Sequence, residues 1–196
     1  MKRIFISLLC IFVFGTTYTQ NSGIEILRDI NLDRNQSLDP FMRSLSQTTA
    51  VICVAVPVSL ITYSFIKKDS ANKFKAVTIG ASVFSAAASG YILKHIVNRT
   101  RPFVTYPDLD KAISAHSPSF PSGHTSNSFS LATSLSLSYP KWYIIAPSYL
   151  WASSVAYSRM HLGVHYPGDV LAGAFIGAGS AFICYKLNKL LAKKYY

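Results

Sequence analysis

The stretch QTTAVICVAVPVSLITYSFI, Gln47–Ile66, contains no Asp, Glu, Lys or Arg. An α-helix rises about 1.5 Å per residue, so about 20 apolar residues are needed to cross the hydrocarbon core of a bilayer. This stretch therefore predicts a membrane-spanning helix. Four later stretches also lack these charged residues: Ala76–Leu93, Gly123–Ser138, Trp142–Ser158 and Val170–Tyr185. All four are predicted as spans as well, although Gly123–Ser138 and Val170–Tyr185 are short and Gly123–Ser138 is rich in serine.

The composition also favours a membrane protein. Half of the 196 residues are apolar, the mean hydropathy is +0.28, and only 14% are charged, against about 25% in soluble domains. The net charge of +11 does not indicate nucleic-acid binding, because the basic residues lie between the apolar stretches rather than in one cluster. We predict an all-α fold: an integral membrane helical bundle of about five transmembrane helices, or six if the N-terminal signal is retained.

The first residues are typical of a targeting segment. Lys2 and Arg3 give a positive start, Ile4–Phe14 is an apolar core too short to span, and small residues precede a cut before Gln20. The predicted organisation is a signal peptide or signal anchor (1–19), an extracytoplasmic amphipathic lead-in (20–46), a membrane-embedded domain (47–190) and a cytoplasmic tail (191–196). Within the lead-in, Asp39-Pro40 is predicted to start a second, short helix.

Charge placement predicts the orientation. If the chain starts outside and crosses five times, eleven Lys and Arg face inward against one acidic residue, Asp69. The outer side then holds eight Lys and Arg against seven acidic residues. Because short loops rich in Lys and Arg stay in the cytoplasm, we expect a multi-pass protein of a bacterial inner (cytoplasmic) membrane. Gly173 and Gly177 form a GxxxG pattern, which favours close helix packing in lipid.

Polar side chains far apart in sequence fall at the outer ends of these predicted spans. They are Lys94 and Arg101 after the second span, His124 at the start of the third, and Arg159, His165 and Asp169 between the fourth and fifth. Ionisable groups that converge at one membrane face predict a functional site. Three cations would repel one another there without an anion, and a phosphate group suits both Arg and Lys.

The remaining groups suit phosphoryl chemistry. A neutral imidazole can attack phosphorus when a carboxylate holds its other nitrogen, and His165 and Asp169 lie four residues apart. His124 is suited to protonating the departing oxygen. In Pro121-Ser122-Gly123-His124, the glycine lies at a helix start, where backbone N–H groups can approach an oxyanion.

Other interpretations compete with a phosphate site. His161, His165 and Asp169 have a spacing that binds a metal on a continuous helix, but Gly163 and Pro167 interrupt that helix. The three cysteines form no CxxC pair, which disfavours structural zinc. An ion path would need charged residues within the spans, and the predicted spans contain none. Taken alone, Lys94 and Arg101 would be interpreted as ordinary residues of the membrane interface.

Three motifs carry a family resemblance: Lys94-x6-Arg101-Pro102, Pro121-Ser122-Gly123-His124 and Ser158-Arg159-x5-His165-x3-Asp169. Together they resemble the signature of the type 2 phosphatidic acid phosphatase superfamily over about Leu60 to Tyr185, and GVHYPGDVLAG is similar to its membrane lipid phosphatase branch. The resemblance implies a helical bundle and hydrolysis through a phosphohistidine, with no metal and no cofactor. It assigns His165 as nucleophile, Asp169 as its orienting partner, His124 as acid, and Lys94, Arg101, Ser122, Gly123 and Arg159 as the phosphate-binding residues. Many membrane members have six spans, whereas five and a signal are predicted here.

The resemblance implies a hydrolase that acts on a lipid phosphate or diphosphate at the periplasmic or exterior face. Undecaprenyl diphosphate, phosphatidylglycerol phosphate, phosphatidate and lipid A 1-phosphate are the candidate substrates, and the sequence does not choose among them. The expected partners are this lipid and the bilayer, without nucleic acid. A membrane anion-binding or transport protein without hydrolysis, a secreted acid phosphatase and a vanadate-dependent haloperoxidase are the alternatives.

Overall fold

The computed structural model describes residues 23–195, with side chains to residue 191. The predicted signal segment, residues 1–19, lies outside the described residues. Within the described part the chain forms helices and loops and no strand, so the predicted all-α class is confirmed. A helix over residues 23–32 comes first. It is followed by η1 (Gln36–Leu38), α2 (Asp39–Ile66), α3 (Ser70–Val97), α4 (Pro102–Thr105), α5 (Gly123–Ser138), α6 (Trp142–His161) and α7 (Pro167–Tyr195).

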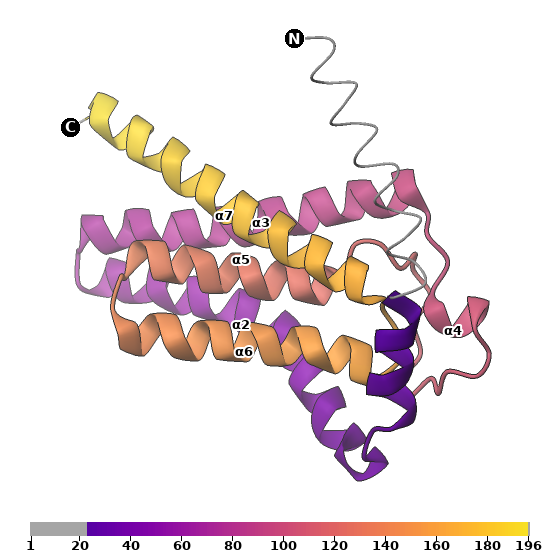
Figure 1. The fold of residues 1–196 in the computed structure, drawn as a ribbon. Coiled ribbons are helices and arrows are strands. Elements are labelled where there is room, and N and C mark those ends of the chain that lie inside the picture. The colour runs from indigo at the N-terminus through magenta and orange to yellow at the C-terminus, as the bar shows by residue number, and fades with distance from the viewer. Residues whose placement is uncertain (1–22, 196) are drawn as a thin grey trace, which may run out of the picture.

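Each of the five predicted spans lies within one of the long helices α2, α3, α5, α6 and α7. These helices alternate in direction and form one bundle (Figure 1). The helix α5 has the predicted bounds, whereas α7 continues to Tyr195 through the segment predicted as a tail. The prediction of a separate short helix at Asp39-Pro40 is wrong. Pro40 does occupy the first turn, which proline favours, but the helix continues unbroken to Ile66.

Three helical segments in the described part are long and apolar enough to cross a membrane by length and composition: Gln36–Ile66, Ser70–Thr105 and Pro167–Leu191. Large apolar side chains are exposed along them, including Val54 on α2, Phe84 on α3 and Phe175 on α7. Apolar surface of this extent is stable only when something apolar covers it, and the helix lengths match a bilayer.

The serine-rich helix α5 lies among the other helices, packed against α2, α3, α6 and α7 (Figure 1). Two of its buried hydroxyls donate within the helix: Ser128 Oγ to the Thr125 carbonyl and Ser134 Oγ to the Leu131 carbonyl, each at 3.1 Å. Because protein rather than lipid surrounds α5, small side chains that admit close neighbours serve better here than large apolar ones. This explains its low hydropathy.

The GxxxG pattern packs α7 against α5. A Cβ atom on Gly177 would overlap the Ser126 carbonyl oxygen and lie 2.9 Å from the Ser130 nitrogen. A Cβ atom on Gly173 would lie 2.7 Å from the Ser122 carbonyl oxygen. Both glycines therefore allow a backbone approach that no larger residue permits, and they bring the N-terminal halves of the two helices together.

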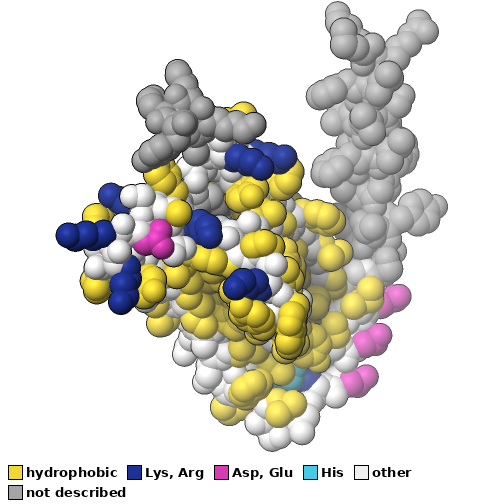
Figure 2. Space-filling model, turned by 90° about the vertical axis from the view of Figure 1, so that its left-hand side faces the viewer, with side chains coloured by type: hydrophobic (Ala, Val, Ile, Leu, Met, Phe, Trp, Pro, Cys, Tyr) yellow, Lys and Arg dark blue, Asp and Glu magenta, His cyan; other side chains and the backbone are white. Residues whose placement is uncertain are grey.

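Lysines gather at one end of the bundle, where α2 meets α3 and α5 meets α6. Figure 2 shows Lys and Arg side chains spread over this end among hydrophobic ones. The exposed lysines there are Lys67, Lys68, Lys73, Lys141, Lys186 and Lys189. The charge asymmetry inferred from the sequence is thus an asymmetry between the two ends of the folded bundle.

Candidate active site

The six ionisable residues predicted to form a site lie at the opposite end of the bundle, on the right in Figure 1. Each comes from a different turn or connection at that end. Lys94 lies in the last turn of α3, Arg101 precedes α4, His124 is in the first turn of α5, Arg159 is in the last turn of α6, His165 is in the α6–α7 connection, and Asp169 is in the first turn of α7. Helix packing therefore brings together residues up to 75 positions apart.

The His165 imidazole is buried, with a side chain only 2% exposed. Its Nδ1 atom lies 3.6 Å from Asp169 Oδ2 and 3.5 Å from Ser119 Oγ. The first distance is longer than a hydrogen bond. Its Nε2 atom points the other way and lies 3.4 Å from Arg101 Nη1. One ring nitrogen thus faces a carboxylate and the other faces a cation.

The Asp169 carboxylate is completely buried and is fixed by three donors. Its Oδ1 atom accepts from Arg99 Nη1 at 2.7 Å. Its Oδ2 atom accepts from Ser119 Oγ and from the Tyr166 backbone N–H at 3.1 Å. The Arg99 guanidinium also lies 3.9 Å from the centre of the Tyr166 ring. With so many donors, the carboxylate keeps its charge and a single orientation beside His165.

Backbone carbonyls hold two of the cations. Arg101 donates from Nε to the Ser117 carbonyl at 2.7 Å and from Nη1 to the Val164 carbonyl at 2.8 Å. Lys94 Nζ donates to the Pro118 carbonyl at 2.5 Å. Neutral carbonyls fix the positions of these cations without cancelling their charge. The positive charge therefore remains available to an anion next to His165 Nε2.

Two of the six predicted site residues, His124 and Arg159, line a cavity of about 500 Å³. Arg159 donates from Nη1 to Ser46 Oγ of α2. Its Nε atom is buried and has no hydrogen-bond partner among the described residues. A buried, charged donor without an acceptor is costly, and an anion in the cavity would satisfy it.

The first turn of α5 adds backbone donors. Ser122 is its N-cap residue, and no side chain caps the first N–H groups of the helix. No atom lies within 4 Å of the position that a Cβ atom on Gly123 would occupy, so the space beside this turn is open. Ser122 itself uses its N–H to reach the Asp169 carbonyl at 3.0 Å, and its hydroxyl accepts from Thr125. This turn suits an oxyanion.

Burial lowers the pKa of His165 to about 4, and the charges of Arg159 and Arg101 act in the same direction. The Asp169 carboxylate opposes this shift without cancelling it. The imidazole is therefore neutral near pH 7. A neutral ring with Nδ1 toward a carboxylate carries its proton there and leaves the Nε2 lone pair free.

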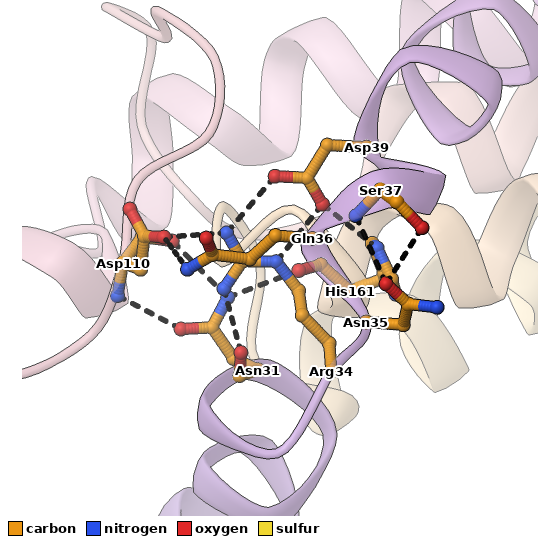
Figure 3. Close-up of polar contacts among 8 residues, drawn as sticks. All are labelled: Asn31, Arg34, Asn35, Gln36, Ser37, Asp39, Asp110 and His161. Atoms are coloured by element: carbon orange, nitrogen blue, oxygen red, sulfur yellow. Dashed lines mark hydrogen bonds and ion pairs between the residues drawn. The ribbon is translucent and has the colours of Figure 1, made fainter.

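The lead-in, in which the sequence indicated no chemistry, supports the connection that carries His165. Asn31 donates to the His161 carbonyl at 3.0 Å and accepts from the Asp110 N–H at 2.8 Å. Asp39 accepts from Arg34 Nε and lies 2.9 Å from His161 Nε2 (Figure 3). His161 is buried and points to this network.

The predicted break between His161 and Asp169 is confirmed, because α6 ends at His161 and α7 begins at Pro167. The two histidines therefore face different carboxylates: Asp39 for His161 and Asp169 for His165. His95 and His116 are both exposed.

Three residues at the site carried no signal in the sequence: Arg99, Ser119 and Ser46. Arg99 lies between two signature residues, where it was counted only as a loop charge. Ser119 and Ser46 are single hydroxyls in a serine-rich chain. Only the fold reveals that they contact Asp169 and Arg159.

A buried imidazole–carboxylate pair, three cations and a cavity thus lie at one end of a bundle of apolar helices, an arrangement suited to binding a phosphorylated lipid. The chain belongs to the PAP2 superfamily, whose family profile matches residues 75–192. It is thus an integral, multi-pass membrane protein and a lipid phosphate phosphatase, as the sequence resemblance implied.

Two curated relatives and one solved structure illustrate the similarity. The chain is 29% identical over 172 residues to an undecaprenyl-diphosphatase of Sulfolobus acidocaldarius, covering 86% of this chain and 81% of that protein. It is 43% identical over 75 residues to a lipid A 4'-phosphatase of Bacteroides thetaiotaomicron, covering 38% of this chain and only a third (33%) of that protein. The transmembrane PAP2-type phosphatidylglycerolphosphate phosphatase of Bacillus subtilis shares the fold, with a TM-score of 0.73, 22% identity and coverage of 94% and 95%.

Proposed function

We propose that the protein hydrolyses a lipid phosphate or diphosphate at the outer face of a bacterial inner membrane, through a phosphohistidine on His165. The observation that supports this most is the two-sided environment of the buried His165 ring. Its Nδ1 faces Asp169, and its Nε2 faces Arg101. An anion that binds Arg101 is brought to the free lone pair of the ring.

In the proposed first step, His165 Nε2 forms a bond to phosphorus while the bond from phosphorus to the lipid oxygen breaks. The electron pair stays on the departing oxygen, which takes a proton from His124. Lys94, Arg101, Arg159 and the first turn of α5, including Ser122 and Gly123, bind the phosphoryl oxygens. Water then attacks phosphorus, His124 takes its proton, and the bond to Nε2 breaks to release phosphate.

Charge neutralisation in this scheme comes from the side chains of the protein, so we propose that no metal takes part. Activity that is lost in EDTA and restored by zinc or magnesium would contradict this part of the proposal. The natural substrate is one of the four candidates given by the sequence resemblance. The named relatives act, by their names, on a lipid A phosphate, undecaprenyl diphosphate and phosphatidylglycerol phosphate, which supports the class without selecting a member.

The deciding experiment is a quench of the purified protein during turnover of a ³²P-labelled lipid phosphate. We expect an acid-labile, base-stable adduct that maps to His165 and is absent from His165→Ala. An anion-binding or transport protein would release no phosphate and would retain its affinity in that variant. No adduct, or an adduct elsewhere, would reject the proposed mechanism.

The proposed orientation has its own test in a background without the three native cysteines. Lys111 and Lys141 are both exposed lysines, at the site end and at the lysine-rich end of the bundle. In intact cells an impermeant thiol reagent should label Lys111→Cys and should spare Lys141→Cys. The reverse pattern would invert the proposed topology.

A further inference from the structure

The cavity beside His124 and Arg159 is lined by a residue outside the matched family region, Arg43 of α2. Among the described residues its guanidinium forms no hydrogen bond and no ion pair. By contrast, Arg28, Arg34 and Arg99 at the same end of the molecule each pair with an aspartate. Arg43 is thus an unpaired cation on the wall of a cavity that already contains the unpaired Nε of Arg159.

The number of cations exceeds the need of one phosphoryl group. Lys94, Arg101 and Arg159, together with the first turn of α5, already supply donors for the oxygens of a single phosphate. Arg43 adds a second cation, beside Arg159, to the wall of the cavity, and the two repel each other unless the ligand carries further negative charge. The arrangement therefore fits an anion larger than one phosphate, and a cavity of about 500 Å³ is in the usual range for small-molecule sites.

A neighbouring groove indicates on which side of the ligand Arg43 lies. This apolar groove of about 350 Å³ is lined from α2 by Phe41, Met42 and Leu45 and from α6 by residues that include Trp151 and Tyr157. The groove and the cavity are lined by different residues of one segment of α2, residues 41–47. A lipid whose phosphate lies beside His165 and whose tail lies in this groove would pass α2 at the position of Arg43.

We propose that Arg43 forms a subsite for the lipid-linked phosphate of a lipid diphosphate, with the first part of its apolar tail in the α2–α6 groove. This inference rests on the proposed function. The His165 Nε2 atom bonds to the terminal phosphorus, and the bond from that phosphorus to the bridging oxygen breaks. The bridging oxygen keeps the electron pair, leaves as part of a lipid monophosphate and takes a proton from His124. Arg43 binds the charge that develops on this leaving group.

The test compares two substrates with the same tail, farnesyl diphosphate and farnesyl monophosphate, on the full-length protein in detergent. Arg43→Gln should lower kcat/KM for the diphosphate about 10- to 100-fold, the effect of losing a hydrogen bond between charged groups, and change that for the monophosphate less than about twofold. Arg43→Lys should recover part of the loss, because it keeps the charge but not the two-pronged geometry.

The matched control is Arg28→Gln, which removes an exposed arginine at the same end but outside the cavity, and it should leave both substrates unaffected. A second readout needs no turnover. Methylenediphosphonate should lose affinity in Arg43→Gln as a competitive inhibitor, while inorganic phosphate should not.

Three results would overturn the subsite. Equal losses on both substrates would place Arg43 at the terminal phosphate or in folding, and unchanged kinetics on both would remove it from binding altogether. In either case, hydrolysis by the parent protein that depends on His165 would leave the proposed function standing. A parent protein that releases no phosphate from either substrate would reject the function and the subsite together.

Discussion

Arg99 and Asp169, seventy residues apart, form an ion pair of 2.7 Å in which the carboxylate is fully buried and the guanidinium is 29% exposed. The same carboxylate lies against His165. Arg99 therefore stabilises the charge that orients the proposed nucleophile, without a described contact to His165 itself. In the proposed mechanism it is a positioning residue, at an unassigned position within the first signature motif.

Replacing Arg99 with Gln should lower kcat about 10-fold, because the buried carboxylate loses its charged partner and its fixed orientation. The KM should change less than about threefold, since the cations that bind phosphate remain. Arg99→Lys should restore part of kcat by keeping the charge. Steady-state kinetics on one lipid phosphate measures kcat and KM for Arg99→Gln and kcat for Arg99→Lys. A rise in KM with an unchanged kcat would instead indicate that Arg99 binds substrate.

Burial of the neutral His165 ring predicts a particular dependence of stability on pH. The pKa is about 4 in the folded protein and about 6.5 in an unfolded chain, so the unfolded chain binds a proton first as pH falls. Stability from this residue is complete above about pH 6.5 and is lost progressively toward pH 4. The full loss is about 3 kcal/mol.

Thermal unfolding in detergent from pH 7 to pH 4 measures this contribution. The parent protein should lose more stability over that range than His165→Asn, which places a similar polar side chain there but cannot titrate. Parallel pH dependences for the two proteins would show that His165 titrates equally in the folded and unfolded states.

Much of the fold could be predicted because lipid imposes a simple rule on the chain. Charge-free stretches such as Gly123–Ser138 coincide with helices, since an unpaired charge inside a bilayer is costly. The same rule places Lys94, His124 and Asp169 at helix ends on one side. Their convergence follows from topology alone, without any knowledge of side-chain packing.

The parts that could not be predicted depend on contacts between distant segments. Nothing local marks Asn31 as a partner of Asp110 and His161, or Ser46 as a partner of Arg159. A buried hydroxyl or amide gains its role from what the fold places beside it. Sequence periodicity carries no such information, so the lead-in was predicted only as an amphipathic surface segment.

The lead-in network makes a testable contribution to stability. Asp39 joins Arg34 and His161, whose side chains are each 2% exposed. Asp39→Asn should destabilise the protein by about 2–3 kcal/mol, less than the full cost of breaking a buried pair, because Arg34 keeps its contact with Asp110. Asp110→Asn is the control: this carboxylate is 47% exposed, and its loss should cost much less.

Hydrogen exchange should locate the effect of Asp39→Asn. Amides in residues 23–32 and in the α6–α7 connection should exchange faster, since the network joins these two segments. Faster exchange confined to the first turns of α2 would show that Asp39 serves only its own helix.

The glycines of α7 provide the sharpest packing prediction, because two of them differ in what faces them. A Cβ atom on Gly177 would overlap the backbone of α5 at Ser126, whereas a Cβ atom on Gly179 would meet no atom within 4 Å. Gly177→Ala must therefore push α7 away from α5, at a cost of about 1–3 kcal/mol or more, since backbone cannot rotate aside as a side chain can. Gly179→Ala should be neutral or slightly stabilising, because alanine favours helix.

The same displacement should reach the site. Gly177 lies two turns beyond Asp169 on α7, and α5 carries His124 in its first turn. Gly177→Ala should therefore lower both the thermal midpoint in detergent and kcat, whereas Gly179→Ala should change neither by much. If both variants have the same thermal midpoint and kcat, the close contact between α5 and α7 does not fix the relative positions of Asp169 and His124.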